Sequence, residues 1–388
     1  MNNFEFYNPV RICFGKGEIA KLSILVPKGA NILLTYGGGS IKKNGVYDQV
    51  TAALKGHNII EFSGIEANPH YETLMKGVAL VKAHNIDFLL AVGGGSVLDG
   101  TKFIAAAALW EGSDPWEILS RRNEVSVKKA LPIGTVLTLP ATGSEMNGNS
   151  VVTRWETRDK LAFDSQYVLP VFSILDPEVV FSLPRIQIAN GIVDAFVHVM
   201  EQYLTYPVNA PIQDRFAESI LITLIEEGPK VLADRSGYDA AANFMWAATM
   251  ALNGLIGAGV PQDWATHTIG HELTAFHGID HGQTLCIVLP GIMKIKRDNK
   301  KEKIIQYGER VWKITEGTED ERIDATIQKT VEFFESVGIK TKLSDYGVGR
   351  EIIAKIAARF VKRGIKAIGE RGDLTIDDVA KILEIQLK

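Results

Sequence analysis

An aspartate and several histidines in the second half of the chain have the types and spacing of a metal site. Asp194 and His198 are four residues apart in a stretch with helical periodicity, so their Cβ atoms are expected roughly 6 Å apart on one face. His267 and His271 have the same spacing, and His281 follows after a predicted turn. A mixed carboxylate and imidazole set suits Zn²⁺ or Fe²⁺, also allows Mn²⁺ or Co²⁺, and disfavours Ca²⁺. We predict a divalent metal bound by one carboxylate and two or three imidazoles, with a position open for a substrate oxygen.

Two Gly-Gly-Gly-Ser turns in the first half are candidates for binding a nucleotide cofactor. The turn Gly93–Ser96 follows a predicted strand and precedes a helix-forming stretch. Free backbone N–H groups in that arrangement point toward an anion, and Ser96 can cap the helix or offer its hydroxyl to a phosphate. Asp99, one turn later, disfavours a phosphate but can accept from amide or ribose groups. A plain tight turn explains these glycines equally well.

The other turn consists of Gly37, Gly38, Gly39 and Ser40. Dinucleotide-binding folds carry an acidic side chain near such a strand end, where it holds the ribose 2′-hydroxyl. No carboxylate stands in this turn, and Lys42 and Lys43 follow it. The pattern favours NADP(H) over NAD(H), with a solvated loop bearing surface lysines as the alternative. The G-x-G-x-x-A match at 15–20 lacks the acid expected about 20 residues on, so we interpret it as a strand-to-helix turn.

The elements that must position these residues differ between the two halves of the chain. The first half alternates short apolar runs with helix-period stretches, which indicates βαβ units around a parallel sheet. The expected strands are 10–14, 31–36, 59–62, 88–92, 135–139 and 171–175, with helices at 71–84 and 97–109. After residue 183 helical periodicity takes over, apart from one β-like run at Thr284–Leu289. We predict an α/β domain over 1–183 and an all-helical domain over 184–388.

Composition excludes several classes of protein. The 388 residues include 42 Lys+Arg and 46 Asp+Glu, a net charge of −4, which offers no basic surface for nucleic acid. No apolar run reaches the roughly 18 residues that a membrane span requires, and the first residues lack the apolar core of a signal peptide. The two cysteines stand far apart in sequence, with no CxxC, so a reducing cytoplasm fits. We expect a cytoplasmic protein without nucleic-acid or membrane partners.

Several motifs occur together in a recognisable order. They are Phe14–Gly17, Gly93–Asp99, Leu139–Glu145, Asp194 with His198, and the tract from Gly259 through His267, His271 and His281 to Gly282. Over essentially the whole chain, this ordered set resembles the iron-containing (group III) alcohol dehydrogenase family. The tract from Val260 to Leu289 and the Gly37–Ser40 turn resemble its NADPH-dependent aldehyde reductase and butanol dehydrogenase branch. Many relatives that use NAD have Asp where Ser40 stands, so the branch and the NADP(H) prediction depend on each other.

The resemblance implies a dehydroquinate synthase-like architecture. A Rossmann-like dinucleotide-binding α/β domain would precede an all-α domain, with the active site in the cleft between them and a homodimer formed through N-terminal strands. The implied metal ligands are Asp194, His198, His267 and His281. His271 would lie near the nicotinamide, off the metal. The implied cofactor residues are Gly94, Gly95 and Ser96 at the pyrophosphate, Asp99 and Thr138 nearby, Thr142, Asn147 and Lys160 toward the nicotinamide, Gly38 and Ser40 at the 2′-phosphate, and Asn68 at the adenosine.

These residues predict reversible hydride transfer between NADP(H) and a primary alcohol/aldehyde pair. The metal, Fe²⁺ or Zn²⁺, would act as Lewis acid, with His267 among its ligands and His271 as a proton relay. One alternative is an NAD-dependent polyol dehydrogenase, acting on glycerol or propanediol, and another is a lyase of the same fold. A lyase for a phosphorylated sugar acid needs cations, and the segments 194–203 and 264–281 contain no Lys or Arg. A non-catalytic metal- or nucleotide-binding module would instead have a closed ligand shell.

Overall fold

The computed structural model describes all residues, 1–388, and they form two compact units. The sheet unit comprises Tyr7–Leu183 and Arg235–Thr249, and the helical unit comprises Met1–Phe6, Pro184–Asp234 and Met250–Lys388. The predicted domains, 1–183 and 184–388, stay a prediction. The two units differ from them because the first six residues belong with the helices and 235–249 belong with the sheet.

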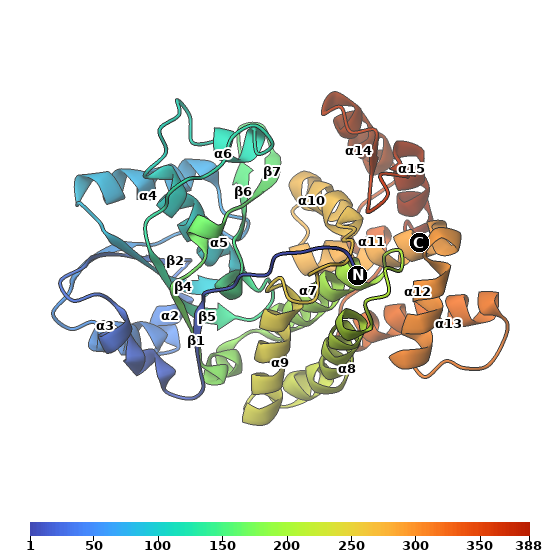
Figure 1. Cartoon of the computed structure of the whole chain (residues 1–388), viewed down its shortest axis with the longest axis horizontal. Helices are drawn as coiled ribbons and strands as arrows, with labels where there is room; N and C mark the ends of the chain where they lie inside the picture. Colours follow the sequence, from blue (N-terminus) through green and yellow to red (C-terminus); the bar gives the residue numbers. More distant parts are fainter. The chain divides into compact units, whose positions relative to one another are not determined.

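The sheet unit is built on a six-stranded sheet in the order β1-β8-β5-β4-β2-β3, and every pairing in it is parallel. Helices α4 and α5 lie on one face and α2 and α3 on the other (Figure 1), so the central strands are buried on both sides and consist of continuous apolar runs. The strands are β1 (Arg11–Phe14), β2 (Asn31–Tyr36), β3 (Asn58–Phe62), β4 (Phe88–Gly94), β5 (Ile133–Leu139) and β8 (Phe172–Leu175). The helices are α1 (Leu22–Leu25), α2 (Ser40–Lys43), α3 (Val46–Ala53), α4 (Tyr71–Ala83), α5 (Gly95–Ala107) and α6 (Glu117–Ser120), with most of α9 (Tyr238–Ala251). The predicted parallel α/β class is confirmed.

An antiparallel hairpin that the sequence analysis does not predict belongs to the same unit. It pairs β6 (Asn149–Arg154) with β7 (Asp159–Asp164), with Thr153 opposite Lys160. Both strands carry polar residues at their ends, so the apolar run in each is too short to mark a strand. The hairpin matters because it supplies one of the predicted cofactor residues, Lys160.

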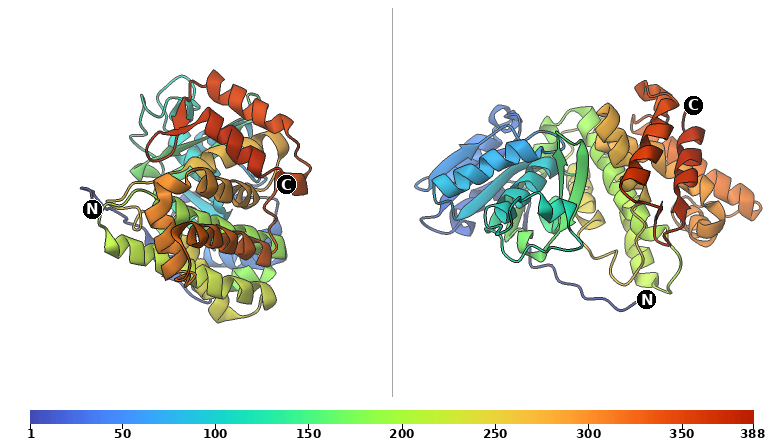
Figure 2. Two further views of the ribbon diagram at one scale, coloured as in Figure 1. Left: turned by 90° about the vertical axis from the view of Figure 1, so that its right-hand side faces the viewer. Right: turned by 90° about the horizontal axis from the view of Figure 1, so that it is seen from above.

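The helical unit consists of long helices, with one small exception. They are α7 (Arg185–Tyr203), α8 (Pro211–Ala233), α10 (Ala265–His277), α11 (His281–Ile295), α12 (Arg297–Arg310), α13 (Glu319–Ser336), α14 (Glu351–Lys362) and α15 (Ile376–Ile385). Figure 2 shows α12–α15, in orange and red, grouped at one end of this unit. The exception to the predicted all-α content is a two-residue pair, β9 (Ala367–Ile368) with β10 (Leu374–Thr375). None of the helices combines the length and the apolar character that crossing a membrane demands.

The predicted β-like run at Thr284–Leu289 is wrong, because these residues lie inside α11. All residues from Thr284 to Met293 are buried, since the helix is covered on every side within the unit. A helix that is apolar all round has no amphipathic period, so its sequence looks like a buried strand.

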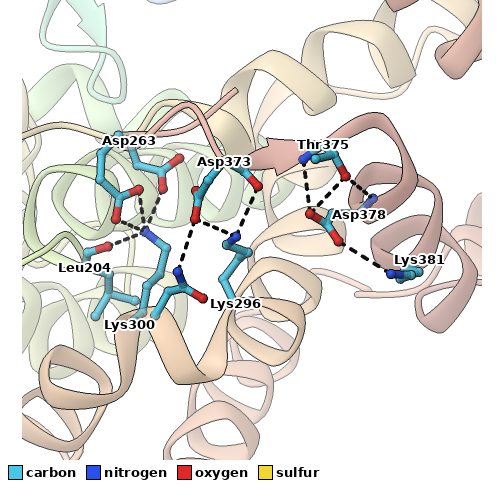
Figure 3. Close-up of polar contacts among 10 residues, drawn as sticks. Leu204, Asp263, Lys296, Lys300, Asp373, Thr375, Asp378 and Lys381 are labelled. Carbon is cyan, nitrogen blue, oxygen red and sulfur yellow. Dashed lines mark hydrogen bonds and ion pairs between the residues drawn. The ribbon is translucent and has the colours of Figure 1, made fainter. Parts of the chain in front are cut away.

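A buried lysine fixes the start of α10. Lys300 of α12 donates to Asp263 at 2.6 Å, to Glu370 at 2.8 Å and to the carbonyl of Leu204 at 2.7 Å (Figure 3). Asp263 in turn accepts from the backbone N–H of Ala265, the first residue of α10, at 2.7 Å. One ammonium therefore holds together α12, the end of α7, the segment before α10 and the β9–β10 connection.

We expect Lys300→Met to destabilise the protein by about 3–5 kcal/mol, because it leaves two buried carboxylates facing each other without a cation. Lys301→Met is the matched control, since Lys301 is half-exposed and pairs only with the exposed Glu319; a change below about 1 kcal/mol is expected there. Urea unfolding of the two variants measures both values. Equal stabilities would show that the Lys300 contacts contribute no more than a surface ion pair.

Candidate metal and cofactor sites

Three helices of the helical unit, α7, α10 and α11, carry the predicted metal ligands. The chain turns at Gly278, as expected, and α11 begins at His281. A Cβ at Gly282 would lie 2.6 Å from the backbone oxygen of Asn190, so only glycine allows the first turn of α11 to approach α7 this closely. The Asn190 side chain also donates to Asp280 at 2.9 Å. These contacts place His281 against the face of α7 that carries Asp194.

Three of the predicted ligands, the histidines, converge on one oxygen of the fourth, Asp194. Asp194 Oδ1 lies 3.6 Å from His198 Nε2, 3.7 Å from His281 Nε2 and 4.0 Å from His267 Nε2. These distances are too long for hydrogen bonds, and Asp194 Oδ1 is buried without a hydrogen-bond partner. Ligand atoms that share one ion at about 2.1 Å are separated by roughly 3.0–3.5 Å. The histidine nitrogens therefore lie only slightly farther from Asp194 Oδ1 than ligand atoms of a loaded site. The ligand atoms of Asp194, His267 and His281 all lie within 4.8 Å of one another, whereas His198 is near Asp194 but outside this group of three.

The charge balance and the exposure of the cluster also suit a catalytic cation. Asp194 is 3% exposed, and its ion pairs are all with histidines, so no lysine or arginine neutralises it. The side chain of His281 keeps 24% of its surface exposed. A buried carboxylate without a cation is costly, and a partly exposed ligand leaves room for a further oxygen. The residues therefore fit an open divalent metal site better than a closed structural one.

His271 lies beside the cluster. Its ring centroid is 5.2 Å from that of His281 and 6.1 Å from that of His267. Its neighbour Glu272 is turned away, because it forms ion pairs with Arg359 and Arg363. The acid next to His271 is therefore occupied in packing α10 against α14. His271 is the titratable group that remains for proton transfer next to the cluster.

Glu201 is a residue of this site that the sequence analysis misses. It lies on α7, is 2% exposed, and its Oε2 is hydrogen-bonded to His267 Nδ1. Burial raises the pKa of Glu201 to about 8, and nearby Asp263 adds to the rise, whereas N–H groups of His267 and Thr266 lower it. A cation on the other ring nitrogen of His267 would favour the charged carboxylate. A divalent ion would also balance the two buried acids, Asp194 and Glu201.

In the sheet unit, the predicted cofactor residues lie at or after the carboxyl ends of neighbouring parallel strands. Segments that follow β2, β3, β4 and β5 carry, in this order, Gly37–Ser40, Asn68, Gly95–Ser96 and Thr142, and such strand ends are where α/β sheets bind ligands. A Cβ at Gly95 would lie 2.5 Å from Thr142, so glycine is needed where α5 begins. The first N–H groups of this 13-residue helix have no partner within it, and such groups are able to bind an anion.

Asn68 links two further predicted residues. Its backbone N–H donates to the hydroxyl of Ser96 at 3.2 Å, and its side-chain oxygen accepts from Lys160 Nζ at 2.8 Å. Asn68 itself has a positive φ of 57°, an uncommon conformation outside glycine. The structure thus brings together the residues predicted for the adenosine, pyrophosphate and nicotinamide portions of one cofactor.

Lys102 is a buried lysine that the sequence patterns do not predict. It binds Asn147 directly and is linked to Asp99 through Ser144. Lys102 Nζ donates to Ser144 Oγ at 2.7 Å and to the oxygens of Asn147 at 2.8 and 3.2 Å. Ser144 in turn donates to Asp99 at 2.6 Å. Burial lowers the pKa of Lys102 to about 8, and burial raises that of Asp99. Thr138, on the neighbouring strand β5, is also buried.

The Gly37–Ser40 turn differs from the prediction in one respect. The turn itself has no carboxylate, but strand pairing brings Glu61 of β3 to within 3.0 Å of the Nζ of Lys42, which follows the turn. Lys42 also lies over the rings of Tyr36 and Tyr47, both of which donate to Glu61. Glu61 therefore neutralises Lys42, and Lys43 is the exposed cation left beside Ser40.

The two cysteines are buried and unpaired. Cys13 lies on β1 and Cys286 on α11. Burial raises the pKa of the Cys286 thiol well above its usual value, and the negative charge of Asp194 adds to this effect. A thiol of this kind is protonated and unreactive, so Cys286 is not a nucleophile.

Comparison with known proteins covers both units. A family model described as iron-containing alcohol dehydrogenase matches residues 9–177, and one described as Fe-containing alcohol dehydrogenase family, C-terminal, matches 188–387. The chain is 59% identical over 385 residues to the NADPH-dependent aldehyde reductase YqhD of Escherichia coli, with 99% of each chain covered. It is 43% identical to the probable NADH-dependent butanol dehydrogenase 1 of Bacillus subtilis, with 100% of each covered.

Solved structures agree with these matches. The substrate- and cofactor-free form of the aldehyde reductase YqhD from E. coli has a TM-score of 0.93 at 57% identity, covering 99% of this chain and 100% of that one. The NADH-dependent butanol dehydrogenase A of Thermotoga maritima has a TM-score of 0.94 at 38% identity, covering 100% and 99%. With both family models matched along nearly its whole length, and with a cluster of one carboxylate and three imidazoles in its helical unit, the chain belongs to the iron-containing alcohol dehydrogenase family.

Proposed function

We propose that this protein catalyses reversible hydride transfer between NADP(H) and a primary alcohol/aldehyde pair, with one divalent metal ion as cofactor. The observation that carries the proposal is the convergence of three imidazole nitrogens on the buried Oδ1 of Asp194. Relatives named as an aldehyde reductase and as butanol dehydrogenases support a small, uncharged substrate. The residues around the cluster agree, because Asp194 has no lysine or arginine partner that would attract an acidic substrate.

The mixed carboxylate and imidazole set accommodates Fe²⁺ and Zn²⁺ alike. Asp194, His198, His267 and His281 would hold the ion, as proposed from the sequence. Their coordination role rests on the geometry of the cluster, and elemental analysis of the purified protein identifies the metal.

NADP(H) is the proposed nucleotide because Ser40 and Lys43 stand where an acidic side chain would hold a ribose hydroxyl. The E. coli relative is named as NADPH-dependent, whereas the B. subtilis relatives are named as NADH-dependent. We propose that Gly37, Gly38, Gly39 and Ser40 face the 2′-phosphate, that Gly94, Gly95 and Ser96 bind the pyrophosphate, and that Asn68, Asp99, Thr138, Thr142, Asn147 and Lys160 bind the rest of the nucleotide.

The chain's own groups bind, orient and move a proton. When bound, the cation supplies Lewis acidity toward the substrate oxygen and the reduced nicotinamide supplies the hydride. The backbone N–H groups at the start of α5 hold the pyrophosphate and thereby fix the cofactor's position. The His271 imidazole lies next to His267 and His281. It transfers a proton from solvent to the substrate oxygen during aldehyde reduction, and from that oxygen to solvent during alcohol oxidation.

A purified-protein assay tests the proposal. NADPH and NADH consumption is measured with butanal and other short aldehydes, and NADP⁺ and NAD⁺ reduction with butanol, glycerol and propanediol. The assay is repeated after chelation and after re-addition of Fe²⁺ or Zn²⁺. We expect aldehyde-dependent NADPH consumption that stops without metal and returns with it. Turnover that continues unchanged after chelation would refute the metal's role. A preference for NAD⁺ with polyols would favour the polyol dehydrogenase alternative.

The homodimer, the cytoplasmic location and the absence of nucleic-acid and membrane partners stay predictions. Light scattering of the purified protein tests the first of them, with a mass of about twice 42.6 kDa as the expected result.

A further inference from the structure

The Nδ1 nitrogen of His267 is hydrogen-bonded to the carboxylate of Glu201, which is itself held in place by further hydrogen bonds. Glu201 Oε1 accepts from the backbone N–H of Thr266 at 2.6 Å and from that of His267 at 3.3 Å. These N–H groups belong to the first turn of α10, where they have no partner within the helix. The carboxylate is therefore oriented, and its Oε2 faces His267 Nδ1.

The turn that carries these N–H groups is itself locked. The backbone N–H of Asp263 donates to the carbonyl of Glu201 at 2.9 Å, so α7 and the start of α10 are joined in both directions. The Asp263 side chain is bound by Lys300, whose ammonium also binds Glu370 (Figure 3). His267 thus projects from a segment that is fixed independently of any metal.

We propose that Glu201 is a positioning residue that selects the metal-binding tautomer of His267. A cation on Nε2 favours the ionised form of Glu201, and an ionised carboxylate only accepts hydrogen bonds, so a proton on Nδ1 satisfies Oε2 and leaves the lone pair on Nε2. That nitrogen faces Asp194 Oδ1 at 4.0 Å. Carboxylate partners of this kind orient metal-bound histidines and raise their basicity. The inference rests on the proposed metal site and adds to it a residue outside the predicted ligand set.

Two substitutions at this position separate hydrogen bonding from packing. In Glu201→Gln the amide oxygen is required by the N–H groups of Thr266 and His267, so the NH₂ group faces His267 Nδ1. The ring must then accept at Nδ1 and carry its proton on Nε2, the atom needed for the metal. Glu201→Ala removes this bias and leaves a cavity instead. A packing role predicts that Gln is nearly neutral and Ala is worse, whereas a tautomer role predicts a large defect already in Gln.

The test measures Zn²⁺ affinity of the metal-free full-length protein by competition with a chromophoric chelator. Far-UV circular dichroism and thermal melting of the same samples check that each variant is folded. Glu218→Gln is the matched control, because Glu218 is also buried in the helical unit but binds Tyr203 and Arg310, away from the cluster. We expect Glu201→Gln to weaken Zn²⁺ binding by about 10- to 100-fold and Glu218→Gln by less than about threefold.

Zn²⁺ binding by Glu201→Gln within about threefold of wild type would overturn the inference while leaving the proposed function intact. Wild-type protein that binds no stoichiometric Zn²⁺ would overturn both. Visible absorption of the Co²⁺ form adds a second readout, because loss of one imidazole changes the ligand field, and an unchanged spectrum in Glu201→Gln would also contradict the inference.

Discussion

His267→Ala is expected to lose its metal and to reduce kcat/KM for aldehyde reduction by at least about 1,000-fold, because a metal's Lewis acidity contributes several kcal/mol to the reaction. His267 supplies one of three imidazole nitrogens around Asp194 Oδ1, and its loss leaves a three-residue set. Metal content by elemental analysis and NADPH consumption are measured on the same preparation. Because the substitution also removes the partner of Glu201, His198→Ala provides a second variant with the same expected result.

The control for this prediction is His277→Ala. His277 is exposed at the end of the same helix, α10, and does not belong to the cluster. Its variant should keep both metal and turnover. Wild-type rates in His267→Ala, with circular dichroism unchanged, would remove His267 from the ligand set.

Ser40→Asp is expected to shift the ratio of kcat/KM for NADPH over NADH by about 100-fold toward NADH. A carboxylate at this position would face the 2′-phosphate, and juxtaposed like charges cost several kcal/mol. The same carboxylate can accept from the free 2′-hydroxyl of NADH. Steady-state rates with each nucleotide at saturating aldehyde give the ratio.

A control with the same change of charge is Ser23→Asp, on the exposed surface of α1. It should leave the ratio within about twofold of wild type. If Ser40→Asp behaves like this control, the Gly37–Ser40 turn does not bind the 2′-phosphate. Lys43→Met tests the same site independently, because Glu61 already neutralises Lys42 and Lys43 is the exposed cation left beside Ser40.

The fold was largely predictable because its elements leave strong local patterns. Strands buried on both faces are continuous apolar runs, and the parallel sheet follows from their alternation with helices. The failure at Thr284–Leu289 comes from the same rule, since α11 is also buried on all sides and its apolar run carries no period. The β6–β7 hairpin was missed for the opposite reason, because polar residues at both ends of each strand leave too short an apolar run.

The metal site could be predicted because its residues have helical spacing in the sequence. Asp194 and His198 share a face of α7 by their separation alone, and Gly278 marks the turn that returns His281. Their roles as ligands remain predictions, although the structure brings all four side chains together. Glu201 escaped notice even though it lies seven residues after Asp194, close to the same face, because an acid on a helix is most often solvated.

Other contacts could not be predicted from the sequence. Glu61 meets Lys42 only because β3 pairs with β2, and no local pattern specifies which strands become neighbours. Lys102 stands three residues after Asp99, a spacing that also describes countless surface ion pairs. Its complete burial among oxygens of Ser144, Asn147 and Asn149 depends on the loop after β5 folding over α5.

Because both native thiols are buried, we expect the folded protein to react little with maleimides and other thiol reagents. A cysteine introduced on the surface of each unit would therefore accept a fluorophore or spin label without background from Cys13 or Cys286. Labelled pairs of this kind would report the separation of the two units in solution, with and without nucleotide, from a single spectroscopic measurement.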